Sequence, residues 1–158
     1  MIIVGIDPGI RNTGFGVIKK NGKLSVLSCG TISPPTKESM AERLKYLYND
    51  AMDLISKYKP DLLAVESTFH QKNVKSALIL GQAKGAILLA AANSNIPTVE
   101  FAPRKVKSAV AGNGSATKEQ VQFMVQRIFK IDKMPKVYDI SDALAIAYCG
   151  LTNIGIQA

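Results

Sequence analysis

The sequence predicts an α/β domain in which helices cover both faces of one five-stranded mixed sheet. Three strand-like segments follow one another at the start of the chain with only short links, which is typical of an antiparallel meander. Two more strand-like segments come later, each after a long helical segment, and a strand–helix–strand passage normally adds a parallel strand through a right-handed crossover. The order of the elements therefore indicates a mixed sheet with helices on its faces.

The first three strands are expected at residues 1–7, 13–19 and 23–32. Their sequences are rich in β-branched residues, and Pro8-Gly9 ends the first of them. Asn21-Gly22 separates the second strand from the third, and this pair strongly favours a tight hairpin. We therefore expect strands 1 to 3 to be antiparallel to one another.

The middle of the chain alternates between helix and strand. Apolar residues at helical spacing predict helices at 38–58 and 72–93. Buried strands are expected at 61–66 and 96–101. Because a helix precedes each of these strands, we expect strands 1, 4 and 5 to be parallel.

Three more helices complete the chain. A basic helix should follow Pro103, a second should open at Thr117 with a capping box and run to Phe129, and the last is expected at about 139–154. No internal repeat, low-complexity segment or linker divides the sequence. Residues 1–158 are therefore expected to form a single domain.

The composition favours a compact protein of the cytoplasm, with no membrane partner. Of the 158 residues 47% are hydrophobic, enough to bury a core without disulfides or a structural metal. Cys29 and Cys149 lie far apart and His70 is the single histidine, so no Cys/His zinc site is expected. The N-terminus lacks the basic region and cleavage site of an export signal. The most hydrophobic stretch, residues 76–92, is interrupted by polar residues and is expected to be too short to cross a membrane.

The charge balance favours a polyanionic partner. Twenty Lys and Arg residues against twelve Asp and Glu give a net charge of +8 and a pI near 9.5. Nucleic acid is the first expectation and an anionic membrane surface the second, while a protein that is merely basic is the alternative. Four of the acids lie at the ends of predicted elements, where carboxylates can converge, and this favours nucleic acid.

These four acids come from two strand ends and one helix start. Asp7 ends the first strand and Glu66 ends its expected parallel neighbour. The backbones of the two strands should lie about 4.8 Å apart, so both acids should leave the sheet at the edge where open α/β sheets hold ligands. Asp139 and Asp142 share one face at the positive end of the last helix. Taken singly, Asp7 could form an Asp-Pro-Gly turn, Glu66 a solvated strand end, Asp139 an N-cap and Asp142 a first-turn acid.

Converging carboxylates repel one another unless cations lie between them. Oxygen ligands select hard ions, so Mg²⁺ is expected, and Mn²⁺ can substitute for it. Two such ions about 4 Å apart would clamp the attacking and leaving oxygens of a phosphoryl transfer. The four acids together therefore indicate a nuclease with two Mg²⁺ ions in each active site and no need of a protein nucleophile.

Five segments of the chain, in this order, resemble the RuvC family of Holliday-junction resolvases: GIDPGIRNTGFGVI, AVESTF, KNVKSALILGQAKG, FAPRKVKSAVAGNGSATKEQV and DISDALAIAYCG. The resemblance runs from Met1 to about Ile154, and LGQAKG and SDALAIA are its most specific parts. It implies a ribonuclease H-like fold, a homodimer, and paired symmetric nicks across a four-way DNA junction that leave 5′-phosphate and 3′-hydroxyl ends in recombination and repair. RuvA and RuvB, which drive branch migration, are implied as partners. The catalytic acids of the family correspond to Asp7, Glu66, Asp139 and Asp142.

The residues expected to hold DNA are basic, with one aromatic: Phe69, Lys72, Lys75, Lys84, Arg104, Lys105, Lys107 and Lys118. A solvated helix face is the alternative for each lysine. Phe69 could fold onto the core, but the resemblance favours stacking on an unpaired base. Lys107 and Lys118 match family positions beside the active site. Lys118 also opposes the dipole of its helix, and a bound phosphate would compensate for this.

The helix at 72–93 is small and apolar on more than one side. Deep burial is one interpretation. In the other, Gly81 and Gly85 permit a close helix approach, partly at the dimer interface that the resemblance implies.

Two other functions fit part of the pattern. Asp7-Pro8-Gly9 with Gly14 and Gly16 resembles the phosphate loop of actin-like and sugar-kinase-like ATPases, although those proteins need a second domain of similar size. A basic module that binds junctions without cutting them is the other alternative.

Overall fold

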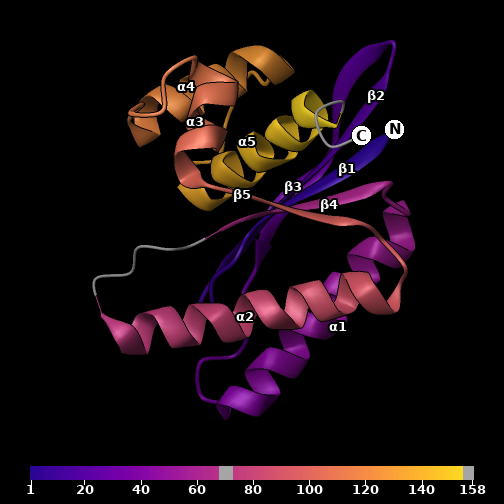
Figure 1. Cartoon of the computed structure of the whole chain (residues 1–158), viewed down its shortest axis with the longest axis vertical. Coiled ribbons are helices and arrows are strands. Elements are labelled where there is room, and N and C mark those ends of the chain that lie inside the picture. Colours follow the sequence, from indigo (N-terminus) through magenta and orange to yellow (C-terminus); the bar gives the residue numbers. More distant parts are fainter. Residues whose placement is uncertain (68–72, 155–158) are drawn as a thin grey trace.

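The computed structural model describes residues 1–67 and 73–154. It contains one sheet with the strand order β3-β2-β1-β4-β5 (Figure 1). The strands are β1 (Ile2–Asp7), β2 (Thr13–Asn21), β3 (Lys23–Ile32), β4 (Leu62–Glu66) and β5 (Thr98–Phe101). β1 pairs antiparallel with β2, and β2 with β3, whereas β1 and β4, and β4 and β5, are parallel. The predicted mixed sheet is confirmed, including the directions of its strands.

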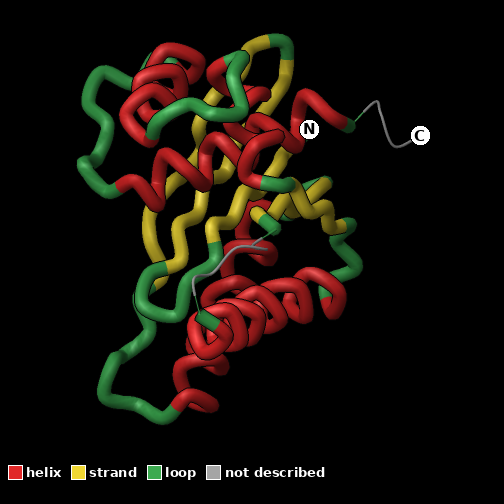
Figure 2. Tube along the Cα trace, turned by 60° about the vertical axis from the view of Figure 1, so that its left-hand side comes forward, coloured by secondary structure: helices red, strands yellow, loops and turns green. Residues whose placement is uncertain are grey.

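The helices are α1 (Met40–Tyr58), α2 (Val74–Asn93), α3 (Pro103–Ala111), α4 (Lys118–Phe129) and α5 (Tyr138–Asn153). Figures 1 and 2 show α1 and α2 on one face of the sheet and α3, α4 and α5 on the other. The predicted capping box opens α4, with hydrogen bonds of 3.2 and 2.9 Å between Thr117 and Gln120. The sheet is therefore covered on both faces, as expected.

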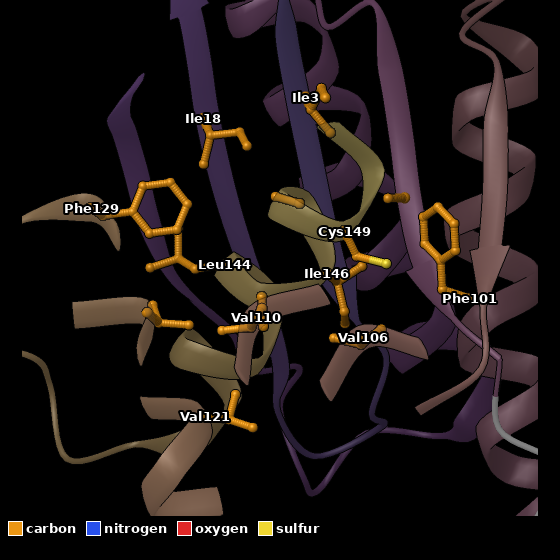
Figure 3. Close-up of a cluster of buried hydrophobic side chains, with 14 of the residues drawn as sticks. Ile3, Ile18, Phe101, Val106, Val110, Val121, Phe129, Leu144, Ile146 and Cys149 are labelled. Carbon is orange, nitrogen blue, oxygen red and sulfur yellow. The ribbon is translucent and has the colours of Figure 1, made fainter. Parts of the chain in front are cut away.

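Each face of the sheet has its own hydrophobic core, because side chains alternate between the two faces along a strand. Val4 of β1 is buried with Leu47 of α1 and Ile87 of α2. Its neighbour Ile3 is buried on the opposite face with Leu144 of α5 (Figure 3). Packing on both sides makes the central strands a firm support for whatever lies at their ends.

Several elements begin later than predicted because polar side chains mark their starts. α1 begins after Ser39 and α2 after Asn73, and each of these side chains accepts a hydrogen bond from a backbone N–H of the first turn, at 3.3 and 2.8 Å. β4 begins after Asp61, whose carboxylate accepts a hydrogen bond of 2.7 Å from the N–H of Ile2.

Much of the apolar surface of α2 is exposed. Val74, Leu78 and Leu89 are 76, 66 and 54% exposed, so the interpretation of deep burial is wrong. A methyl group at Gly81 or Gly85 would meet nothing within 4 Å, so neither glycine serves close packing against the residues that the structure describes. α2 has 20 residues and is long and apolar enough, by length and composition alone, to cross a membrane, so the predicted shortness of this stretch is also wrong. An exposed apolar helix side of this kind is typical of a surface that binds a partner.

Candidate active site

Asp7 and Glu66 lie at the same edge of the sheet, as predicted. They are the last residues of β1 and β4, and the residues before them, Ile6 and Val65, are paired in the parallel register. Both carboxylates line one cavity at this edge. The strand ends therefore bring together two acids that are 59 positions apart in the sequence.

Asp139 and Asp142 reach the same edge on α5 because glycines let this helix approach the sheet closely. Gly14 is paired with Asp7 across β1 and β2, and a Cβ atom at Gly14 would overlap the backbone carbonyl of Asp139. A Cβ atom at Gly5 would overlap the backbone of α5 one turn further along. The glycines of these strands thus place the start of α5 beside the end of β1.

This packing also explains the glycines that suggested an ATPase phosphate loop. Gly14 lies under the start of α5, and a Cβ atom at Gly16 would come within 2.7 Å of the Leu144 side chain. Both glycines lie inside β2 and serve the contact between the sheet and α5. Gly14 and Gly16 therefore have a packing role that does not require a bound nucleotide.

Asp139 is not a helix cap. The N-cap of α5 is Val137, which has no capping side-chain hydrogen bond, and Asp139 is the second residue of the helix. The interpretation of Asp139 as an N-cap is therefore wrong. Its carboxylate is half-buried in the first turn, where the helix dipole favours a negative charge.

Three of the acids and two lysines line one cavity of about 220 Å³. Asp7, Glu66 and Asp142 form its acidic part, and Lys107 of α3 and Lys118 of α4 face them. Apolar side chains of α3 and α4 complete the wall. Asp139 lines a second, more open hollow of about 480 Å³ between the β1–β2 loop and α2.

The acids that line the cavity have raised pKa values. Burial first, and then the nearby charges of Glu66, Asp142 and Asp139, together raise the pKa of Asp7 to about 8. Burial is also the main reason why the pKa values of Glu66 and Asp142 are raised. Such a cluster is costly to ionise in the folded protein unless positive charge lies beside it.

Two lysines place positive charge beside these acids. Lys118 Nζ lies 3.7 Å from Asp142 Oδ2, and the same ammonium group lies 5.7 Å from the centre of the Tyr138 ring. Lys118 and Lys107 both lower the pKa values of Glu66 and Asp142. A positive charge in the first turn of α4 is unfavourable because it opposes the helix dipole. The carboxylate of Asp142 compensates for at least part of this effect without a bound phosphate.

The donor atoms of this site fit a hard divalent cation. All of the candidate ligands are carboxylate oxygens, which suit Mg²⁺ and Mn²⁺. In the part of the chain that the structure describes, no three His, Cys, Asp or Glu side chains are yet arranged to hold a single ion. Asp142 is turned to Lys118 instead. The carboxylates would therefore suit such an ion, and they would have to rotate toward one another to hold it.

The other predicted DNA contacts differ in their surroundings. Phe69 and Lys72 lie outside the described residues. Lys84 pairs with Glu100 at 2.7 Å and ties α2 to β5, so the structure does not favour a phosphate contact for it. Lys105 lies 5.8 Å from the centre of the Phe101 ring and is exposed. The remaining two, Lys75 and Arg104, are exposed cations in the first turns of α2 and α3.

Sequence reasoning missed two residues that shape the site. Gly14 sets the distance between Asp7 and Asp139, and its signal was visible, since a glycine inside a strand often marks a close backbone approach. Tyr138 supports the Lys118 ammonium group with its ring and donates a hydrogen bond of 3.1 Å to Glu119 Oε1. No sequence pattern indicated this role of Tyr138, because its partners come from another helix.

Without divalent ions, Asp7 should make the stability of the protein depend on pH. Its pKa is 3.8 when unfolded and about 8 when folded, so the unfolded state releases the proton first and folding stability falls between these pH values. Asp7→Asn should therefore unfold with a free energy equal to the wild type at pH 4 and higher by on the order of a few kcal/mol at pH 8. Urea denaturation in EDTA across this range measures the difference. A difference that does not change with pH would contradict the raised pKa.

Comparison with known proteins agrees with this geometry. The family profile described as "Crossover junction endodeoxyribonuclease RuvC" matches residues 3–150. Proteins of that name from Natranaerobius thermophilus and Chlorobium phaeovibrioides are 48% and 46% identical to the chain. The matches cover 94% and 98% of this chain and 93% and 83% of the relatives.

A solved structure with the same fold is that of Thermus thermophilus RuvC in complex with a Holliday junction substrate. It is 30% identical, with a TM-score of 0.90 over 99% of this chain and 97% of that one. The ribonuclease H-like architecture is thereby confirmed. The chain belongs to the RuvC family of crossover junction endodeoxyribonucleases.

Proposed function

We propose that this chain resolves four-way DNA junctions by hydrolysis at the cavity formed by Asp7, Glu66 and Asp142, with two Mg²⁺ ions as cofactors and Asp139 as a further ligand. The observation that carries the proposal is the environment of Asp7. Asp7 is a buried carboxylate with a pKa near 8, and three other acids lie near it in a protein of net charge +8. Ionising such a cluster is energetically unfavourable unless it binds cations.

Each acid has a distinct part in this proposal. The charges of the other three acids all act on Asp7, so Asp7 would be a ligand shared by the site, with Glu66 and the two acids of α5 completing the set of residues that would hold the ions. When bound, divalent ions lower the pKa of an attacking water and neutralise charge on the leaving 3′ oxygen. The rigid strand ends keep Asp7 and Glu66 in place, so little reorganisation is needed during the reaction.

Lys107 and Lys118 would hold the substrate phosphate. Both ammonium groups face the acids across the cavity, which leaves room between them for an anion. Lys118 would exchange its contact with Asp142 for a phosphate oxygen when ions take over the charge of the carboxylates. Lys75, Arg104 and Lys105 would add weaker, salt-dependent contacts along the arms of the junction.

A junction with two-fold symmetry needs two symmetric cuts, and we propose a homodimer that uses α2. One side of α2 packs on α1 and the sheet through Ala83, Ile87 and Ala90, while Leu78 and Leu89 stay exposed on its surface. Gly81 and Gly85 lie in this apolar surface and leave space for a second copy. A second α2 is therefore the occupant that this surface fits best.

Charges placed on this surface should separate the dimer. Leu78→Glu with Leu89→Glu would bury two carboxylates without partners in the interface, so we expect a monomer in place of a dimer. Sedimentation equilibrium measures the mass, and Val137→Glu, at an exposed apolar residue beside α5, is the matched control that should leave the dimer intact. A double variant that remains dimeric would place the interface elsewhere.

Cleavage assays test the function itself. With Mg²⁺, the protein should nick a synthetic four-way junction at two symmetric positions, leaving 5′-phosphate and 3′-hydroxyl ends, and should leave a linear duplex of the same sequence intact. EDTA should abolish the nicks. Hydrolysis of ATP in the absence of DNA, or a junction that survives with Mg²⁺, would contradict the proposal. In the cell, we expect the enzyme in the cytoplasm, where RuvA and RuvB would bring the junction to it.

A further inference from the structure

The hollow beside Asp139 is lined by α2, which covers the opposite face of the sheet from α3 and α4, the helices that carry Lys107 and Lys118. Its walls are the β1–β2 loop at residues 9–12, the first turns of α2 and Asp139 itself. Figure 1 shows the lower end of β1 close to the N-terminal half of α2, where this loop lies. At about 480 Å³ the hollow has room for part of a nucleotide.

The positive charge in this hollow comes from Arg11. It is the cationic residue among those that line the hollow, and its side chain is exposed. Within residues 1–67 and 73–154, no acidic side chain lies within ion-pair distance of it. Arg11 therefore has no ion-pair partner among the described residues, and it lines the same hollow as Asp139 of the candidate active site.

The loop that carries Arg11 is held by three hydrogen bonds, which come from residues of β2 and α1. Thr13 Oγ1 donates to the Gly9 carbonyl at 2.7 Å and accepts from the Gly9 N–H at 3.1 Å. Arg43 Nη2 of α1 donates to the Ile10 carbonyl at 2.8 Å, although the Nε atom of Arg43 is buried with no hydrogen-bond partner in the described part of the chain. A loop fixed in this way presents its charge without being ordered by a ligand.

A fourth contact fixes the tip of the loop. Ser33 Oγ, just beyond β3, donates a hydrogen bond of 2.7 Å to Asn12 Oδ1. A Cβ atom at Gly9 would overlap the Asn12 carbonyl, so the loop closes tightly on itself. Arg11 lies between these two anchored residues.

An enzyme that nicks a continuous strand must seat nucleotides on both sides of the scissile phosphate. Lys107 and Lys118 come from α3 and α4, on one face of the sheet. We infer that the hollow beside Asp139 seats the cleaved strand on the other side, and that Arg11 binds the phosphate of a neighbouring nucleotide there. The inference rests on the proposed function, because it names a subsite of the same nuclease.

Junction binding by Asp7→Asn protein, which should not cut, tests this directly. Adding Arg11→Ala should weaken binding roughly five- to tenfold near 0.1 M salt and should reduce the slope of log K against log salt by about 1, as expected for one lost phosphate contact. Arg11→Lys should restore most of the affinity. Lys20→Ala, which removes an exposed charge at the opposite end of the sheet, should change neither quantity by more than the general effect of net charge.

Single neutral methylphosphonate linkages within three nucleotides of the cut identify the phosphate. One of them should weaken binding to the parent protein and have no effect on the Arg11→Ala variant. If every linkage acts equally on both proteins, or if Arg11→Ala leaves the salt slope unchanged, the inference is wrong while the proposed function stands. If the parent Asp7→Asn protein itself fails to prefer junctions over linear duplex, the proposed function has failed instead.

Discussion

Asp7→Asn should reduce the rate of junction cleavage by at least about 10³-fold, which corresponds to roughly 4 kcal/mol of transition-state stabilisation, while junction binding stays within a few-fold of the wild type. Asp7 lies at the centre of the acid cluster, and each of the other three acids acts on its pKa. An amide of the same shape keeps the packing but removes the charge that would hold two cations. Single-turnover cleavage of a labelled junction with Mg²⁺ measures the rate.

Loss of activity in this variant cannot come from loss of folding. The raised pKa of Asp7 opposes folding at neutral pH, because the unfolded state releases a proton that the folded state must keep, so the substitution should leave the protein at least as stable as the wild type. Asp132→Asn, at an exposed acid away from the cavity, is the matched control and should cut at the normal rate. An Asp7→Asn protein that retains more than a tenth of the activity would remove Asp7 from the catalytic centre.

Gly14→Ala should lower cleavage by about 10²-fold and the free energy of unfolding by about 1–3 kcal/mol. The new methyl group would overlap the Asp139 carbonyl, so the start of α5 must move away from β2. Because Gly14 is paired with Asp7, this movement separates the acids of α5 from Asp7. A displacement of about 1 Å is enough for a loss of that size.

Gly30→Ala is the matched control for this prediction. Gly30 is a strand glycine on β3, and its added methyl group would meet only the end of the Phe15 ring, at 3.0 Å. We expect some loss of stability and cleavage within a few-fold of the wild type. If Gly14→Ala lowers stability yet cuts at the normal rate, the glycine has a packing role only, and the approach of α5 does not set the site.

The acids at strand ends were the most predictable part of the site. Asp7 and Glu66 follow buried strands, and strand direction alone brings them to one edge. The position of Asp139 was less predictable, since the cap interpretation depended on where α5 begins. The helix begins at Tyr138, and its first turn packs on Gly14, which lies far away in the sequence.

Long-range pairings account for the other differences. Lys84 appeared to be one of several similar cations, but Glu100 of β5 engages it at 2.7 Å. Tyr138 and Arg43 act through contacts with α4 and with the β1–β2 loop. The hydrophobicity of α2 predicted that it is a helix, but not which side is covered, because burial depends on what packs against it.

The most direct test of the central claim is anomalous diffraction from crystals soaked in Mn²⁺. We predict two anomalous peaks about 4 Å apart, in contact with Asp7 and divided between Glu66 on one side and the acids of α5 on the other. Crystals of Asp7→Asn soaked in the same way should lose at least one of the peaks. Crystals of the wild-type protein that show no peak at the end of β1, in a soak that saturates cleavage in solution, would contradict the assignment of this carboxylate cluster as the metal-binding catalytic centre.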